Sequence, residues 1–347
     1  MNLLAGDIGG TKTLLGVYKW NDEPVKIHQK KYISKEWSSL ELIITDYIKT
    51  LPNNINEPRF ACLALAGPVS NGSCKLTNLE WDVNYNDICK SLGFRSLELI
   101  NDICAHIYAI PYLKPNQFID VQEGKKNINE INKGSIALIA SGTGLGIARG
   151  FLQNNRIHAM PSEGGHKEFA PRSEKEWEVC KWIKSDLNLE RLSIERVISG
   201  TGLGNIARWR LSKPDAISHP LKDISENWNE KNFHEHDLPA LASKAAKNGD
   251  LLMEEVLEIW LSGYGSAAGD LALQELCHCG LWIAGGTTPK HINGIRSTTF
   301  LENMRNKGRF KDFLSQIPVM AIIDPEAGLF GAACRAHMIA ESSEKLI

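Results

Sequence analysis

Residues 5–12 read AGDIGGTK, and this stretch decides the fold that we predict for the rest of the chain. Apolar segments precede and follow it, an order typical of a strand, a tight glycine turn and a second strand. Adjacent glycines let a backbone approach a ligand closely, and successive amides in such a turn form an anion-binding concavity. We therefore interpret the turn as a grip for a nucleotide phosphate, with Asp7 placed to meet a phosphate-bound magnesium ion. The alternative is an ordinary hairpin turn with Asp7 as a local cap.

The composition is that of a globular protein with room for two domains. The chain has 347 residues, of which 43% are hydrophobic and 23% charged, and a formal net charge of -2. That charge does not suggest a nucleic-acid-binding surface, and no apolar run reaches the roughly 18 residues of a membrane span. The first residues do not resemble a secretory signal, and eight scattered cysteines in such a chain favour reduced thiols. We therefore expect a cytoplasmic protein with no nucleic-acid and no membrane partner.

The first hundred residues alternate between strand and helix patterns. Strands are expected at residues 3–6, 13–20, 25–32, 60–66 and 96–100, an amphipathic helix at 40–51 and a short helix at 85–92. Residues 74–76 are expected to return beside the strand at 60–66. A meander followed by alternating helices and strands predicts a mixed sheet with helices covering its faces.

The pattern restarts after a polar connection at residues 111–133. Strands expected at 135–140 and 145–152 flank the turn Ser141-Gly142-Thr143-Gly144, which repeats the opening layout. Two such turns, one per lobe, could hold a polyphosphate between them, although a second plain hairpin is the alternative. A near copy, SGTGLGNIAR at 199–208, has helical flanks. We interpret it as a helix–turn–helix connection with Gly200 and Gly202 as helix breakers, and not as another phosphate site.

Polar residues that could contact a ligand lie in two further places. Asn101 and Asp102 follow the strand at 96–100, and ligand chemistry in open α/β sheets gathers at the carboxyl ends of strands. The alternative is a helix cap for the helix expected at 103–110. The loop PSEGGHKEFAP at 161–171 places Glu163 and His166 around two glycines, so both side chains can face one polyol. The alternative there is a solvated surface loop.

The remaining chain is largely helical. Helices are expected at residues 174–187, 238–247 and 251–276, the last with glycines that permit close packing. A strand at 281–284 runs into Gly285-Gly286, another close-approach turn, for which a plain strand-to-helix bend is the alternative. A final strand at 318–323 is followed by Asp324 as the cap of a helix at 326–340, whose small-residue face we expect to pack tightly on a sheet.

Taken together, the motifs resemble those of the bacterial glucokinases of the hexokinase and actin-like ATPase superfamily. The ordered series is DIGGT at Asp7, LAGPV at Leu65, TNxxW at Thr77, IND at Ile100, SGTGLG at Ser141, EGGH at Glu163, ERVISG at Glu195 and AGG at Ala284. The resemblance spans nearly the whole chain. It implies an α/β, two-lobed actin-like ATPase (ribonuclease H-like) fold with mixed sheets flanked by helices and the active site in the cleft between the lobes. The domains expected are 1–112 plus 318–347, the smaller, and 113–317, the larger.

The resemblance also implies roles for individual residues. Sugar contacts fall on Asn101, Asp102, Glu163, His166 and Glu195, with Asp102 as the catalytic base. ATP contacts fall on Gly6, Asp7, Ile8, Gly9, Gly10, Thr11, Ser141, Gly142, Thr143 and Gly144, and on Gly285 and Gly286 against the adenosine. Asp7 is the carboxylate expected nearest Mg²⁺, directly or through water. The sequence departs from the family pattern at Ser162, where glycine is common, and at Thr201, where proline is common.

The implied reaction is ATP-dependent phosphorylation of glucose to glucose 6-phosphate, the first step of glycolysis, by a homodimer. Related kinases that share the DxGGT hairpin usually carry a cysteine-rich zinc motif after their Glu-x-x-His; none follows His166, so no structural zinc is expected. Two other functions stay open: a non-catalytic sugar sensor on the same fold, and a kinase for mannose, fructose or an N-acetylhexosamine. The sequence also leaves open whether ATP or polyphosphate is the donor.

Overall fold

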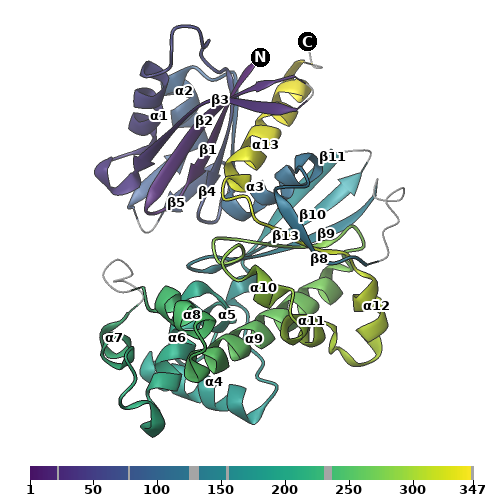
Figure 1. Ribbon diagram of the computed structural model, residues 1–347. Coiled ribbons are helices and arrows are strands. Elements are labelled where there is room, and N and C mark those ends of the chain that lie inside the picture. The colour runs from purple at the N-terminus through teal and green to yellow at the C-terminus, as the bar shows by residue number, and fades with distance from the viewer. Residues whose placement is uncertain (22, 77–78, 125–132, 154–155, 230–236, 345–347) are drawn as a thin grey trace. The chain divides into compact units, whose positions relative to one another are not determined.

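The chain divides into two compact units in the computed structural model (Figure 1). The structure describes residues 1–21, 23–76, 79–124, 133–153, 156–229 and 237–344, so Thr77 of the TNxxW motif lies outside the described residues. Unit 1 comprises Met1–Phe118, Ala148–Pro161 and Asp324–Ile347, and unit 2 comprises Ile119–Ile147 and Ser162–Ile323. The domain boundaries predicted at residues 112 and 318 stay a prediction.

Unit 1 is built on a five-stranded mixed sheet with the order β3-β2-β1-β4-β7. The opening meander is antiparallel, whereas β4 runs parallel to both β1 and β7. The strands are β1 (Asn2–Ile8), β2 (Lys12–Trp20), β3 (Pro24–Ile33), β4 (Phe60–Leu65) and β7 (Ser96–Asn101). The five strands predicted for this region are therefore present, and the mixed sheet is confirmed.

Helices cover both faces of this sheet, which explains why every residue of the interior strand β4 is buried (Figure 1). Helices α1 (Leu40–Lys49) and α2 (Tyr85–Leu92) pack on one face. On the other face lie α3 (Asp102–Ala109) and α13 (Ala327–Glu344). The small residues of α13 let it approach α3 as well as the sheet, because a Cβ on Gly331 would collide with the carbonyl oxygen of Ala105.

One expectation for unit 1 is wrong. Strand β5 (Ser73–Leu76) pairs with β6 (Trp81–Asn84) in a separate two-stranded sheet, and not with β4. Both edges of β4 are already occupied by β1 and β7, so no third strand can join it. The expected cap of the last helix is present, because Oδ1 of Asp324 accepts a hydrogen bond from the amide of Glu326 at 2.9 Å. Helix α13 itself begins at Ala327, one residue later than expected.

The second sheet has six strands in the order β11-β10-β9-β12-β13-β8. Its central strands β12 and β9 are parallel, as are β12 and β13. The bounds are β8 (Phe118–Gln122), β9 (Lys133–Ser141), β10 (Leu145–Gln153), β11 (Arg156–Ser162), β12 (Leu281–Ala284) and β13 (Val319–Ile322). The two outermost strands were not predicted, and β8 falls in the segment expected to be a plain connection. Both edge strands mix polar and apolar residues, so neither has the apolar run of a buried strand.

Helices make up most of the remainder of unit 2. They are α4 (Glu174–Asp186), α5 (Glu195–Ile198), α6 (Gly200–Leu211), α7 (Lys222–Asn227), α8 (Leu238–Lys247), α9 (Leu251–Glu275), α10 (Ile292–Ile295), α11 (Thr298–Arg305) and α12 (Lys311–Gln316). The glycines of α9 permit close packing as predicted, because a Cβ on Gly265 or Gly269 would collide with carbonyl oxygens of α11. None of the described helices is both long and apolar enough to cross a bilayer.

The interpretation of Gly200 and Gly202 as helix breakers is wrong. Both glycines lie in the first turn of α6, and the connection from α5 is the single residue Ser199. The Ser199 hydroxyl caps the helix by accepting a hydrogen bond from the Gly202 amide at 3.0 Å. This capping bond starts the helix before the glycines, so their low helix propensity does not end it.

Candidate active site

The glycine turn between β1 and β2 is held open toward solvent in unit 1. The Gly9 amide donates to the Lys12 carbonyl at 2.9 Å, and the Ser34 hydroxyl donates to the Gly9 carbonyl at 2.8 Å. Within the described part of the chain, the amides of Gly10 and Thr11 have no protein acceptor. Two free donors in a glycine turn are what a phosphate oxygen requires. The contribution of Ser34 was not predicted, because nothing in its local sequence marks it as a support for the turn.

Asp7 lies near the end of β1, just before this turn. Burial raises the pKa of Asp7, while the nearby Lys12 ammonium acts in the opposite direction. A Cβ placed on Gly328 of α13 would lie 3.6 Å from Oδ2 of Asp7, so the missing side chain leaves room beside the carboxylate. A carboxylate that is costly to ionise alone, with space at its side, is suited to a cation.

Three parallel strands of unit 1 end together and bring the predicted residues to one edge. Asp7 of β1 lies opposite Ala64 of β4, which lies opposite Ile100 of β7. Asn101 and Asp102 follow directly. Because adjacent strands are about 4.8 Å apart, Asp7 and the Asn101–Asp102 pair lie about 10 Å apart along this carboxyl edge. The expected clustering of these groups at strand ends is therefore present within unit 1.

Asn101 and Asp102 begin helix α3 and are held by several hydrogen bonds. Oδ1 of Asn101 and Oδ1 of Asp102 each accept from the Ile103 amide at 3.0 Å. The Asn101 side-chain amide also donates to the carbonyl of Gly67, in the LAGPV motif, at 3.3 Å. The pair is therefore a helix cap and is also oriented from a neighbouring strand end. A helix cap explains the hydrogen bonds from the Ile103 amide but does not require the hydrogen bond to the Gly67 carbonyl.

In unit 2, the EGGH loop is pinned against the start of β10. Glu163 precedes a short 3-10 turn, Gly164–His166, and its Oε2 lies 3.8 Å from Nε2 of His166. The Glu163 and His166 side chains are 61% and 55% exposed, so both remain available to a ligand. Gly165 cannot carry a side chain, because its Cβ would collide with the carbonyl oxygen of Leu145.

Glu195 also contacts Leu145. It is the first residue of α5, and its Oε2 accepts a hydrogen bond from the Leu145 amide at 2.9 Å. A Cβ on Gly144 would lie 2.6 Å from that oxygen, so the turn before Leu145 must be glycine there. The loop with Glu163 and His166, the carboxylate of Glu195 and the Ser141–Gly144 turn therefore converge on Leu145.

The segment at Gly285-Gly286 supports the Ser141–Gly144 turn by binding the carbonyl of Ser141, the first residue of that turn. The amide and the hydroxyl of Thr287 donate to the Ser141 carbonyl at 3.1 Å and 2.9 Å. Gly285 has a φ of 95°, and a Cβ there would collide with the Ser141 backbone. Only glycine combines that dihedral with so close an approach. The two glycine turns, which are more than a hundred residues apart in sequence, are thus built against each other.

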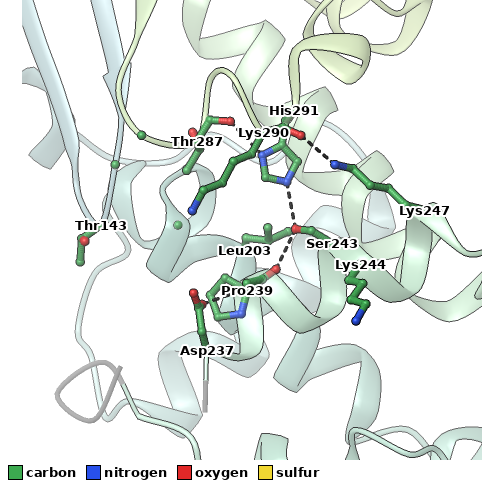
Figure 2. Close-up of a pocket in the computed structure, with 14 residues that line it drawn as sticks. Thr143, Leu203, Asp237, Pro239, Ser243, Lys244, Lys247, Thr287, Lys290 and His291 are labelled. Atoms are coloured by element: carbon green, nitrogen blue, oxygen red, sulfur yellow. Dashed lines mark hydrogen bonds between the residues drawn. The ribbon is translucent and has the colours of Figure 1, made fainter. Parts of the chain in front are cut away.

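A pocket of about 470 Å³ opens beside these two turns in unit 2 (Figure 2). Its size suits a nucleoside. It is lined by the two turns, the start of α6, helix α8 and the segment before α10: Gly142, Thr143, Gly200, Leu203, Asp237, Pro239, Ala240, Ser243, Lys244, Lys247, Gly286, Thr287, Lys290 and His291.

Comparisons with known proteins agree with this arrangement. The family model described as Glucokinase matches residues 4–339. The chain belongs to the glucokinase family. It is 38% identical to a glucokinase of Trichormus variabilis over 346 residues, which cover 97% of this chain and 99% of that protein. The crystal structure of a glucokinase from an Antarctic psychrotroph superimposes with a TM-score of 0.79 at 28% identity, covering 97% of this chain and 99% of the other.

A more distant solved structure is similar to this chain in fold. The ROK family glucokinase from Streptomyces griseus, in complex with glucose and AMPPNP, superimposes with a TM-score of 0.61 at 19% identity, covering 97% of this chain and all of the other. With these neighbours, the predicted two-lobed actin-like ATPase fold, α/β with mixed sheets flanked by helices, is confirmed.

A buried histidine joins two walls of the 470 Å³ pocket of unit 2 (Figure 2). Nε2 of His291 lies 2.9 Å from the Ser243 hydroxyl of α8, and its Nδ1 lies 3.0 Å from the Thr287 carbonyl. Burial lowers the pKa of His291. Its Nδ1–H donates to the Thr287 carbonyl, and its Nε2 faces the Ser243 hydroxyl, which itself donates to the Pro239 carbonyl at 2.7 Å. The α8 residues of this pocket were not predicted, because they lie some forty residues before Gly285-Gly286 and form no recognisable motif.

The structure thus places the predicted site residues in two groups. Unit 1 holds Gly6, Asp7, Ile8, Gly9, Gly10, Thr11, Asn101 and Asp102. Unit 2 holds Ser141, Gly142, Thr143, Gly144, Glu163, His166, Glu195, Gly285 and Gly286. Within each unit the predicted residues lie on adjoining turns and strand ends.

Proposed function

We propose that Asp102 is the general base with which this member of the glucokinase family transfers the γ-phosphoryl group of ATP to the primary hydroxyl of glucose. The observation that carries the proposal is the common carboxyl edge of β1, β4 and β7, which presents Asp7 and the Asn101–Asp102 pair from rigid strand ends. Phosphoryl transfer to a hydroxyl requires an acceptor for the departing proton. The Asp102 carboxylate, held at the start of α3, is that acceptor.

Five polar side chains bind the sugar in this proposal. Asn101 and Asp102 of unit 1 and Glu163, His166 and Glu195 of unit 2 supply carboxylates, an amide and an imidazole, which pair with hydroxyl groups as acceptors and donors. The hydrogen bonds on Asn101 and Glu195 fix these two side chains before the sugar arrives. A site built to pair each hydroxyl discriminates against sugars that lack one, because its own polar groups are then left unpaired.

The nucleotide is held by the two glycine turns and by the pocket of unit 2. The amides of the Gly9–Thr11 and Ser141–Gly144 turns bind phosphate oxygens, and the adenosine lies against Gly285 and Gly286 in the pocket. The Streptomyces griseus structure, which holds AMPPNP, supports a nucleoside triphosphate as donor. A pocket of nucleoside size beside the turn favours ATP over polyphosphate, which has no nucleoside to fill it.

The surroundings of Asp7 fit a magnesium ion. Mg²⁺ usually binds through one or two carboxylates and the substrate phosphates while keeping several waters. Asp7 would hold the ion, directly or through water, in the space that Gly328 leaves beside Oδ2. When bound, Mg²⁺ neutralises charge on the phosphates. Lys12 follows the same turn and adds a positive charge near Asp7.

Further parts of the proposal concern the setting of the reaction. We propose that the enzyme is a cytoplasmic homodimer that supplies glucose 6-phosphate to glycolysis, with no structural zinc and no nucleic-acid or membrane partner. The glucokinase family membership supports this setting. Sedimentation of the purified protein checks the dimer.

Lys290 offers a prediction about the nucleotide pocket. Its side chain extends across the pocket on the side of Thr143, whereas the ammonium of Lys247 donates to the Lys290 carbonyl at 3.1 Å (Figure 2). We expect Lys290→Met to raise KM for ATP about tenfold, because a hydrogen bond to a charged group contributes roughly 1.5–3 kcal/mol. Initial rates at varied ATP and saturating glucose measure the effect. Lys181→Met, at an exposed position of α4, is the control and should leave KM unchanged. An unchanged KM in Lys290→Met contradicts the prediction.

A panel of sugars tests the proposed function. Glucose, mannose, fructose and N-acetylglucosamine are compared at matched concentration with ATP and Mg²⁺, with each component omitted in turn. The proposal predicts the highest kcat/KM for glucose and no phosphorylation without ATP. A clear preference for another sugar overturns the substrate, and glucose binding without phosphorylation makes the chain a sugar sensor.

A further inference from the structure

The second copy of the SGTGLG sequence, at residues 199–204, lies against the first. Helix α6 begins at Gly200, directly beside the Ser141–Gly144 turn. The Gly200 amide donates to the Gly142 carbonyl at 2.8 Å. Thr201 donates twice to the Thr143 carbonyl, through its amide at 3.2 Å and its hydroxyl at 2.9 Å. Of the two segments with the same sequence, the second donates these hydrogen bonds and the first accepts them.

The first-turn amides of α6 are all in use, so this helix start is not a second anion site. Gly200 and Thr201 donate to the neighbouring turn, Gly202 donates to the Ser199 hydroxyl at 3.0 Å, and Leu203 donates to the Ser199 carbonyl at 2.9 Å. The amides that a helix start normally offers to a ligand bind backbone carbonyls and the capping serine here.

The contact between the two copies is tight and is supported from behind. A Cβ on Gly200 would lie 2.8 Å from the Gly142 carbonyl oxygen, so a larger residue would push the turn away. The indole of Trp260, a fully buried residue of α9, donates to the Ser199 carbonyl at 3.0 Å. The second copy is therefore fixed to the core of unit 2, and the first copy is fixed to it.

The geometry of the peptide bond gives this contact a consequence for the ligand. In a trans peptide the carbonyl and the following amide point in opposite directions. Hydrogen bonds that hold the carbonyls of Gly142 and Thr143 toward α6 therefore aim the amides of Thr143 and Gly144 away from α6. We propose that Thr201 is a positioning residue that orients the phosphate-binding amides of the Ser141–Gly144 turn. This inference rests on the proposed nucleotide site and adds a residue that touches the turn and not the ligand.

A graded series of substitutions at position 201 tests the proposal. Thr201→Ser keeps both donors, Thr201→Val removes the hydroxyl, and Thr201→Pro removes the hydroxyl and the amide while remaining compatible with the first turn of a helix. The expected dissociation constants for ADP are unchanged for serine, raised about 3- to 10-fold for valine and raised further for proline, since one hydrogen bond contributes about 0.5–1.5 kcal/mol.

A comparison of ADP with adenosine separates a positioning role from a merely structural one, because a structural defect would weaken the binding of both ligands. Because the Ser141–Gly144 turn binds the phosphates in this proposal, Thr201→Val should lower the affinity for ADP and leave the affinity for adenosine unchanged, both measured by calorimetry. The control is Thr45→Val, which removes a hydroxyl bonded to the Glu41 carbonyl at 2.7 Å on α1 and should change neither affinity. Equal ADP affinity in wild type and Thr201→Val overturns the proposal, as does equal loss of ADP and adenosine binding.

The proposal and the proposed function can fail separately. A wild-type protein that binds ADP, loses that affinity in Thr201→Val and yet phosphorylates no glucose supports the positioning role and contradicts the kinase. If the wild-type protein phosphorylates glucose and Thr201→Val binds ADP normally, the result supports the kinase and contradicts the positioning role. A wild-type protein that binds neither ADP nor adenosine overturns both.

Discussion

The Asp102→Asn protein is expected to bind glucose with little change and to phosphorylate it roughly 10²–10⁴-fold more slowly. Asparagine has nearly the same shape and keeps an oxygen that can accept from the Ile103 amide at the start of α3. Its amide cannot accept the proton that the sugar hydroxyl loses. Glucose binding is measured by calorimetry, and kcat by release of ADP at saturating glucose and ATP.

Asp87→Asn is the matched control for this substitution. Asp87 is an exposed carboxylate in the first turn of α2, and it belongs to neither group of site residues. Its replacement should leave kcat and glucose affinity unchanged. Near-normal turnover in Asp102→Asn would remove Asp102 from the role of base, and a matching loss of glucose binding would make it a sugar contact only.

Asp7→Asn is expected to lower kcat by roughly 10²–10³-fold and to raise the thermal unfolding temperature. The carboxylate organises charge at the phosphates, and losing one such preorganised group typically has an effect of this size. The stability gain follows from burial, which raises the pKa of Asp7 and so disfavours its charged form in the folded chain. A neutral amide removes that cost. Stability is compared by calorimetric unfolding without nucleotide.

The pH dependence gives the same prediction a second check. Because the folded pKa of Asp7 is raised, its ionisation destabilises the fold as pH increases through that pKa. The gain in Asp7→Asn should therefore be present at neutral pH and vanish in acid, where the wild-type carboxyl is protonated. Asp82→Asn, an exposed aspartate on β6, is the control and should show neither effect. A less stable Asp7→Asn protein contradicts this account of the carboxylate.

Much of the fold could be predicted because its central elements carry strong local patterns. Strand β4 is a continuous apolar run, and helices α2 and α8 have the bounds expected from the sequence. The edge strands β8 and β11 could not be predicted, since one side of each faces no partner strand and their residues are mixed. The partner of β5 could not be predicted either, because pairing depends on which sheet edges are already occupied.

The site was predictable where a residue belongs to a motif and not where it only supports one. Glu195 was expected from the ERVISG motif, but its bond to the Leu145 amide depends on two segments that lie fifty residues apart. Ser34, Lys290 and His291 were missed for the same reason: each acts through a contact that only the folded chain creates. The role of Thr201 belongs to this class, because the repeat is visible in the sequence and its hydrogen bonds are not.

The most direct test of the central claim is phosphorus NMR of the wild-type protein with glucose, ATP and Mg²⁺. The account predicts glucose 6-phosphate and ADP in equal amounts, and neither product when glucose or ATP is omitted. ADP without a sugar phosphate, or no consumption of ATP although glucose binds, would contradict it.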